Sequence, residues 1–202
     1  MIDDDKSDAE WVKRVQSGQT EAFEVLVTRH QNRIFSLLYR WLGDYDDAAD
    51  AAQDVFLAAF RGIGSFRGEA AFGTWLYRIA ANHAKNRRKQ MAARQQRTVP
   101  LETTDSHGEN PGPAATLAAP DPNPAQALEQ RERERWVQQA LNSLDADEAL
   151  VILMKDFQGM SYDEMAQVLQ VPRGTVKSRL HRARQALNEK LAPYFVSPEV
   201  KQ

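Results

Sequence analysis

Residues 98–127, near the middle of the chain, constrain its fold more than any other stretch. These thirty residues include six prolines, no aromatic residue and no lysine or arginine, and their only charged side chains are acidic. Such a segment cannot bury enough apolar surface to offset the entropy lost on ordering. We therefore expect a flexible linker with one folded unit on each side of it.

Both flanking parts show apolar residues at helical spacing and no strand-like alternation. Capping-box patterns at Ser7–Glu10, Asp145–Glu148 and Ser161–Glu164 predict helix starts, and Thr20 can cap another helix. Gly43 is a plausible helix stop. The sequence thus predicts an all-α chain with two small helical domains, at residues 1–97 and 128–202, joined by the linker.

Composition also argues against several classes of protein. The chain has no cysteine, which excludes a disulfide framework and cysteine-based zinc sites and fits a reducing cytoplasm. Its four histidines lack metal-ligand spacing, and no hydrolase or phosphate-binding motif occurs. No apolar run reaches the roughly 18–20 residues needed to cross a bilayer. We expect no catalytic residue, metal, cofactor or small-molecule substrate, and hence no enzyme.

The pattern from Ser161 to Leu187 predicts a helix-turn-helix. A short capped helix is followed by a tight connection ending at Pro172 and then by a basic helix. On that helix, residues 174, 177, 178, 181, 182 and 185 share one face, opposite Val176, Leu180 and Ala183. A polar face of this kind fits the major groove of DNA. The alternative is a helical hairpin with a solvated basic face.

A second basic segment lies between Glu69 and Glu102, where seven lysines and arginines occur without an acid. Four aromatic residues stand at its start: Phe66, Phe72, Trp75 and Tyr77. Cations beside aromatic rings suit unpaired bases, because the cations bind phosphates and the rings stack. The alternative is that Trp75 and its apolar neighbours are core and the charges are solvated.

An acidic patch forms the third feature, with aspartates at positions 44, 46, 47, 50 and 54. Asp47, Asp50 and Asp54 fall on one helical face. Such a patch repels DNA and indicates a basic protein partner. Alternatively, the aspartates are there because negative charge is favourable at the N-terminus of a helix. This explanation does not extend to Asp54, which lies two turns into the helix.

In this order, these parts resemble the extracytoplasmic-function (ECF) sigma factors of the sigma-70 family, and most closely their sigma-E-like branch. The resemblance rests on five motifs and covers roughly residues 8–97 and 126–192. The motifs of region 2 of that family are matched by Gly18–Phe23, Asp50–Phe56 and Phe72–Asn82. The motifs of region 4 are matched by Gly159–Ala166 and Gly174–Arg184.

The resemblance implies three binding surfaces. The surface for the clamp helices of the largest polymerase subunit would consist of Asp47, Asp50, Gln53, Asp54 and Phe56. The surface for the −10 promoter element, in which the loop around Phe66 holds a flipped base, would consist of Phe66, Trp75, Arg78, Asn82, Lys85 and Arg88. The surface for the −35 element, in which Lys177 and His181 depart from the residues common in the branch, would consist of Arg173, Thr175, Lys177, Ser178, His181 and Arg182.

The same resemblance implies an alternative sigma factor that binds core RNA polymerase through its β and β′ subunits, melts promoters and serves a stress response. It also implies a cytoplasmic protein controlled by an anti-sigma factor, which in this family is often anchored in the membrane. Two other interpretations remain open from the residues alone. One is a helix-turn-helix regulator that binds duplex DNA by itself; the other is a nucleic-acid enzyme using the aspartate cluster.

Overall fold

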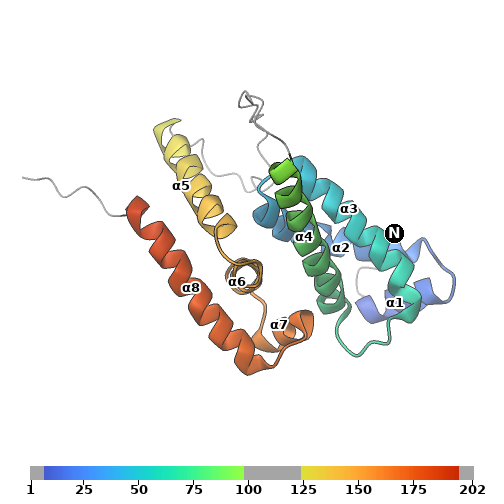
Figure 1. Cartoon of the computed structure of the whole chain (residues 1–202). Coiled ribbons are helices and arrows are strands. Elements are labelled where there is room, and N and C mark those ends of the chain that lie inside the picture. The colour runs from blue at the N-terminus through green and yellow to red at the C-terminus, as the bar shows by residue number, and fades with distance from the viewer. Residues whose placement is uncertain (1–6, 98–123, 196–202) are drawn as a thin grey trace, which may run out of the picture.

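The computed structural model describes residues 7–97 and 124–195, which are helical almost throughout and include no strand (Figure 1). We refer to these ranges as the N-terminal and C-terminal units. The N-terminal unit contains α1 (Asp8–Gln16), α2 (Ala22–Leu42), α3 (Tyr45–Gly62), the 3₁₀ turn η1 (Ile63–Ser65) and α4 (Phe72–Arg97). The C-terminal unit contains α5 (Pro124–Asn142), α6 (Ala146–Ile152), the π-helical turn η2 (Leu153–Phe157), α7 (Tyr162–Leu169) and α8 (Arg173–Phe195). The all-α prediction is confirmed.

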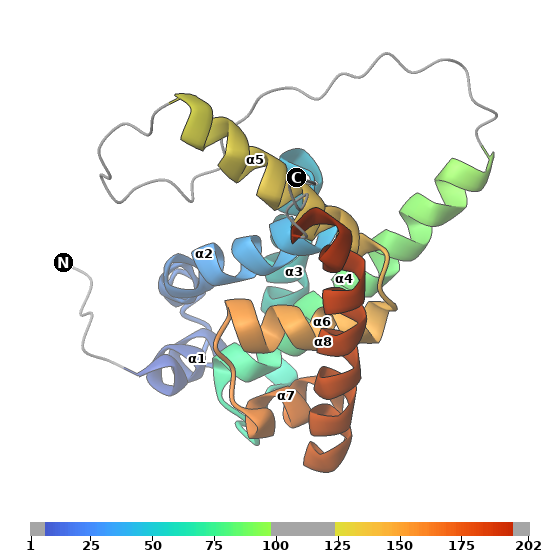
Figure 2. The same ribbon diagram turned by 90° about the vertical axis from the view of Figure 1, so that its left-hand side faces the viewer.

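The predicted linker falls mostly outside the described residues, which exclude 98–123. Its last four residues, 124–127, form the start of α5. Proline at the first helical position explains the start of α5, because its missing N–H has no partner there in any case. Figure 2 shows the C-terminal end of α4 extending beyond the packed helices.

Two predicted helix ends in the N-terminal unit are formed by local hydrogen bonds. The backbone N–H of Ser7 donates to Glu10 Oε2 at 2.9 Å, as a capping box requires. Gly43 closes α2 at φ 78°, and its N–H donates to the carbonyl oxygen of Tyr39 at 2.8 Å. The predicted cap at Thr20 is wrong, because α2 begins at Ala22 after Glu21.

The C-terminal unit contains one full capping box. The N–H of Ser161 donates to Glu164 Oε2 at 2.8 Å, and the N–H of Glu164 donates to Ser161 Oγ at 3.2 Å. Asp145 caps α6 differently from the prediction, because it accepts from the N–H of Asp147 at 2.9 Å instead of pairing with Glu148.

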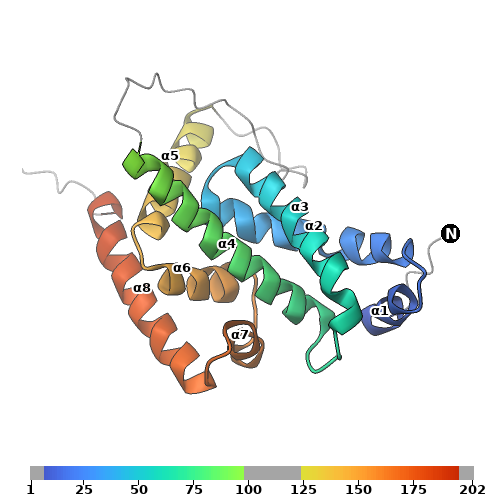
Figure 3. The same ribbon diagram turned by 45° about the vertical axis from the view of Figure 1, so that its right-hand side comes forward.

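One hydrophobic core runs through both units. Leu26, Leu38 and Leu76 are fully buried in the N-terminal unit, and Leu150 and Leu180 are in the C-terminal unit. Burying each such side chain contributes about 1.5–3 kcal/mol. In Figures 1 and 3, α6 and α7 lie beside α4, and α8 forms the outer edge. The two units are therefore packed together, with α4 at their junction.

Candidate nucleic-acid and protein interfaces

The polar face of α8 is the most accessible of the three predicted surfaces. Lys177, Ser178, His181 and Arg182 are exposed, whereas Val176 on the opposite face is fully buried. The turn before α8 places Gln170 in the left-handed region at φ 55°, which lets the chain reverse within three residues. The helix-turn-helix geometry predicted from the sequence is therefore present.

Three members of this surface have partners within the C-terminal unit. Arg173 lies 3.5 Å from Asp163, and Lys177 lies over the Tyr162 ring with its Nζ 5.7 Å from the centroid. The hydroxyl of Ser178 donates to the carbonyl oxygen of Thr175 at 3.1 Å. These contacts orient the side chains while leaving Arg173, Lys177 and Ser178 exposed.

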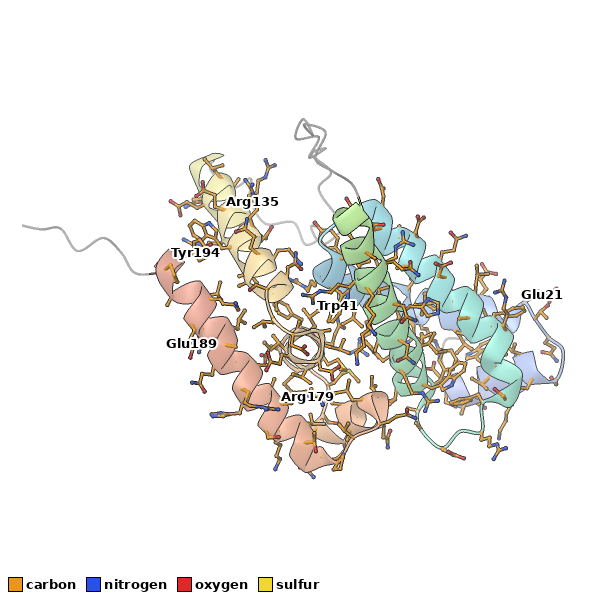
Figure 4. All side chains as sticks on the ribbon, in the orientation of Figure 1. Glu21, Trp41, Arg135, Arg179, Glu189 and Tyr194 are labelled. Carbon is orange, nitrogen blue, oxygen red and sulfur yellow. The ribbon has the colours of Figure 1, made fainter. Side chains whose placement is uncertain are left out.

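Two basic residues of α8 have a structural role that the sequence did not indicate. Arg179 lies on the inner side of the helix, where its guanidinium is 2.9 Å from Asp147 of α6 (Figure 4). Arg184 donates hydrogen bonds from two of its nitrogen atoms to the carboxylate of Asp156 of η2. Hydrogen bonding to Asp156 is the main cause that raises the pKa of Arg184. Both pairs fasten α8 to the helices behind it.

The aromatic residues before and within α4 form a cluster, part of which is buried. Phe66 lies 5.1 Å from Trp75 and 6.1 Å from Phe72, measured between ring centroids. Phe72 and Tyr77 are only 3% and 5% exposed, so these two rings belong to the core, as the alternative interpretation of the segment has it. Phe66 and Trp75 are half-buried and remain candidates.

An open pocket lies beside this cluster. Its lining includes Phe66, Trp75 and Arg78 of the N-terminal unit, and also Gln167 and Gln170 of the C-terminal unit. The loop wall is positioned by Gln16 of α1, whose amide nitrogen donates to the carbonyl oxygens of Ile63 at 2.8 Å and Phe66 at 2.9 Å. A flat, half-buried ring next to a cation can accept a planar base here.

Along α4, the candidate polar residues differ in accessibility. Asn82 is exposed and Arg78 is half-buried, whereas Lys85 and Arg88 contact the C-terminal unit. Lys85 Nζ lies 2.5 Å from Asp147 Oδ1. This hydrogen bond is the main cause that holds the pKa of Asp147 below its usual range, with further lowering by the charges of Lys85 and Arg179.

Arg88 is half-buried and contacts both units. It donates to the carbonyl oxygens of Asn142 and, at 3.0 Å, Leu144, and its guanidinium carbon lies 5.3 Å from the centre of the Trp41 ring. Burial lowers the pKa of Arg88, an effect partly opposed by Asp145. Trp41 itself lies between α4 and α6 (Figure 4), and its indole N–H donates to the carbonyl oxygen of Ala84 at 3.0 Å.

The acidic patch on α3 is partly neutralised within the chain. Arg87 of α4 donates to Asp47 Oδ1 at 2.7 Å, and it lies 3.7 Å from Asp50. The hydrogen bond with Asp47 is the main cause that raises the pKa of Arg87. Asp50, Gln53 and Asp54 are exposed, so the part of the patch open to a partner is smaller than the sequence indicated.

An apolar groove between α2 and α3 adjoins this patch. Gln53 and Phe56, both predicted site residues, line it together with Phe23, Leu57 and Phe60. Leu57 and Phe60 are 45% and 39% exposed, although both are large and apolar. Sequence reasoning missed these two, although they are large apolar residues of α3 that lie outside its buried stripe of Ala51, Val55 and Ala59.

Neither a metal site nor a membrane-spanning helix is found in the two described ranges. In residues 7–97 and 124–195, no three histidine, aspartate or glutamate side chains are grouped so that they could hold a metal ion. Across the same ranges, no helix combines the length and apolar character needed to cross a bilayer.

Comparisons with known proteins match both units. The family model for sigma-70 region 2 matches residues 26–95, and that for sigma-70 region 4 matches residues 134–187. The RNA polymerase sigma-H factor of Pseudomonas aeruginosa is 38% identical over 188 residues, covering 93% of this chain and 95% of the relative. The ECF RNA polymerase sigma-E factor of Escherichia coli K12 is 37% identical over 182 residues, covering 90% and 93%.

Two solved structures share the fold. CnrH, determined in complex with the cytosolic domain of CnrY, has a TM-score of 0.65 at 24% identity and covers 93% of this chain and 99% of its own. The sigma factor RpoE of Bartonella quintana, determined in complex with the anti-sigma factor NepR, has a TM-score of 0.61 at 23% identity. The match covers 84% of this chain and 96% of RpoE.

Proposed function

Because this chain belongs to the ECF branch of the sigma-70 family, whose members act with RNA polymerase in transcription initiation, we propose that it binds core polymerase, recognises −35 and −10 promoter elements and promotes promoter melting. One observation carries this proposal. The chain has two chemically different candidate surfaces for nucleic acid, a polar helix face on α8 and an aromatic pocket at α4, on separate units.

The α8 surface is proposed to read the −35 element in the major groove. Lys177, His181 and Arg182 supply donors on the exposed face, and Arg173 and Thr175 stand at the beginning of the helix, where base edges are reached first. Lysine lacks the planar fork with which arginine reads guanine, so Arg182 is the better candidate for a bidentate base contact.

The α4 surface is proposed to hold the −10 element as single-stranded DNA. Phe66 and Trp75 form one side of the open pocket, which has room for an unstacked base. Asn82 is uncharged, so its contribution is hydrogen bonding to a base, whereas Arg78, Lys85 and Arg88 attract the phosphate backbone.

The α3 surface is proposed to bind the β′ clamp helices, with further contacts to β. Asp50 and Asp54 supply an acidic edge, and Gln53 and Phe56 continue it into the apolar groove, to which we add Leu57 and Phe60. A basic amphipathic partner matches an apolar groove with an acidic edge.

Regulation is proposed by analogy with relatives. RpoE of Bartonella quintana was solved with an anti-sigma factor, and we infer that an anti-sigma factor also binds this chain. The proposal includes a cytoplasmic location, at the inner membrane face when the anti-sigma factor is anchored there, and a part in a stress response. It includes no catalytic role.

In vitro transcription with core polymerase and a promoter library tests this function. The expected result is transcription from promoters that share two sequence elements, and only when the chain is added. A regulator that binds duplex DNA alone gives the opposite pattern, namely tight promoter binding at physiological salt without polymerase and no capture of core polymerase in a pull-down. That pattern would refute the proposal.

A further inference from the structure

The helix-turn-helix is preceded by a turn of uncommon geometry. In η2 the N–H of Gln158 donates to the carbonyl oxygen of Leu153, five residues earlier, at 3.1 Å, whereas an α-helix would bond to the fourth. Lys155, in the middle of this turn, contacts Tyr162 at the start of α7. Because π-helical turns are frequent at functional sites, the pair of Lys155 and Tyr162 is a candidate functional element.

Local contacts fix the position of the Tyr162 ring. Tyr162 is the first residue of α7 and follows the Ser161 cap, which pairs with Glu164. Lys155 Nζ donates to the carbonyl oxygen of Met160 at 3.0 Å, and this bond closes the turn before the cap. The same Nζ lies over the Tyr162 ring, 5.1 Å from its centroid. The ring is half-buried and packs against the hydrophobic core, so it forms a fixed surface beside α8.

Lys177 of α8 lies over this same ring. Its Nζ is 5.7 Å from the ring centroid, and its side chain remains exposed on the polar face. Arg173, one turn earlier on α8, lies 3.5 Å from Asp163, the residue after Tyr162. The face of an aromatic ring is electronegative and attracts an ammonium group above it. The start of α8 is therefore joined to the start of α7 at two adjacent points.

The kind of contact decides whether Lys177 can still bind DNA. An ammonium group has three N–H donors, and a ring face occupies only one side of it, so donors remain for a base edge. Arg184 is the contrasting case, because two of its nitrogen atoms donate to the carboxylate of Asp156. Lys177 is thus held in place and still available to a ligand.

A lysine depends on such positioning more than an arginine does. Its charge is a point charge at the end of a flexible four-carbon stem, whereas the guanidinium group is a rigid planar fork. Ordering the stem costs rotamer entropy, and a ring that already restrains the ammonium group lowers that cost. The saving matters only with a base that accepts a hydrogen bond from Lys177. It therefore increases the difference in affinity between bases and not the affinity in general.

We propose that Tyr162 is a positioning residue for sequence recognition, which holds the ammonium group of Lys177 so that Lys177 discriminates one base of the −35 element. The expected base is guanine, whose O6 and N7 both accept hydrogen bonds in the major groove. This inference rests on the proposed function. It assigns to α7 and the π-helical turn a part in base selection without a base contact of their own.

Variants of the full chain, assembled with core polymerase, test this role. Tyr162→Leu removes the ring but keeps an apolar side chain, Tyr162→Phe removes only the hydroxyl, and Lys177→Met removes the ammonium group. Trp136→Leu is the matched control, because Trp136 is another half-buried ring of the C-terminal unit and stacks on Tyr194. Figure 4 shows Tyr194 at the end of α8 far from the helix-turn-helix.

The measurement is binding of each holoenzyme to a pool of promoter duplexes with randomised −35 positions, followed by sequencing of the bound DNA. The preference at a position is the ratio between its best base and the other bases. This ratio is compared within one preparation, so it does not depend on the fraction of protein that is folded. The position at which Lys177→Met removes the preference identifies the base that Lys177 contacts.

Tyr162→Leu should lower the preference at that position by about two- to fivefold, which corresponds to an exposed contact between a cation and a ring, and change other positions by less than about twofold. Tyr162→Phe and Trp136→Leu should leave every preference within the same limit. In the Lys177→Met background, Tyr162→Leu should have no further effect at that position, because the group that the ring holds is gone.

A ring that only supports the fold gives a different result. Tyr162→Leu then weakens binding to all promoters alike and leaves the preference at each position unchanged, which overturns the inference. A loss of preference that persists in the Lys177→Met background overturns it as well. So does a Lys177→Met variant that loses no preference, because Lys177 then contacts only phosphate. If the proposed function itself fails, the wild-type holoenzyme shows no base preference at any −35 position.

Discussion

Replacing Phe60 with alanine should weaken binding to core RNA polymerase by about 25-fold. The side chain is 39% exposed in the wall of the α2–α3 groove. An aromatic side chain has roughly 200 Å² of surface, so about 80 Å² of Phe60 remains to be buried by a partner. At about 25 cal/mol per Å² this burial contributes about 2 kcal/mol, and about 1.4 kcal/mol corresponds to a factor of ten in affinity.

A competition assay against a labelled sigma factor for core polymerase measures this change. Phe60 also contacts the Phe23 ring, with centroids 5.1 Å apart, so thermal unfolding must be recorded in parallel. Tyr39→Ala is the matched control, because Tyr39 is an aromatic residue of the same unit, is 36% exposed and lies outside the groove lining. If Phe60→Ala competes as well as Tyr39→Ala within about twofold, the groove is not part of the polymerase interface.

Three further predictions concern the other surfaces and the fold. Asp54→Arg should abolish transcription by lowering the affinity for core polymerase. Because the Asp54 carboxylate is exposed, the helical content measured by circular dichroism should stay unchanged. If the variant competes for core polymerase as well as wild type does, this prediction is contradicted. Arg182→Ala should weaken −35 recognition by about 1–3 kcal/mol if Arg182 contacts a base edge. Asn82→Ala should instead reduce open-complex formation, and a template with a pre-melted −10 bubble should rescue it only partly. Complete rescue would mean that Asn82 assists strand separation instead of reading a base. The backbone hydrogen bond from Ser161 is the main cause that holds the pKa of Glu164 below its ordinary value. The stability that Glu164 contributes is therefore fully present above the pKa of Glu164 in the unfolded chain. It is lost as the pH falls through the lower pKa of Glu164 in the folded chain. In urea unfolding, wild type should therefore lose more stability than Glu164→Gln between pH 6 and pH 3, and equal losses would exclude the capping effect.

Local patterns predicted the helices well, because helix ends depend on nearby residues. The capping box at Ser161 and Glu164 and the glycine stop at Gly43 need only three or four consecutive residues to form. The buried stripe of α8, with Val176 and Leu180, follows from the 3.6-residue period in the same way.

Pairing across the fold could not be predicted, because it depends on residues far apart in sequence. Arg179 and Arg184 look like DNA-binding cations in the sequence, yet Asp147 and Asp156 hold them in place. Likewise, no periodicity indicates that Lys85 meets Asp147 across the two units. A charged side chain has the same sequence signature whether its counterion is a distant carboxylate or a ligand.

The amide of Gln16 has a consequence for exchanging promoter specificity between family members by domain transplantation. Both of its hydrogen bonds are donated to carbonyl oxygens of the segment that leads to the pocket, at Ile63 and Phe66. A glutamate of the same shape has no donor when ionised and would face two acceptors, so the loop would lose its anchor. The family match begins only at residue 26. A graft cut at that boundary would carry Phe66 and Trp75 of the pocket without the helix that positions its loop, and the transplanted segment therefore needs to begin before Gln16.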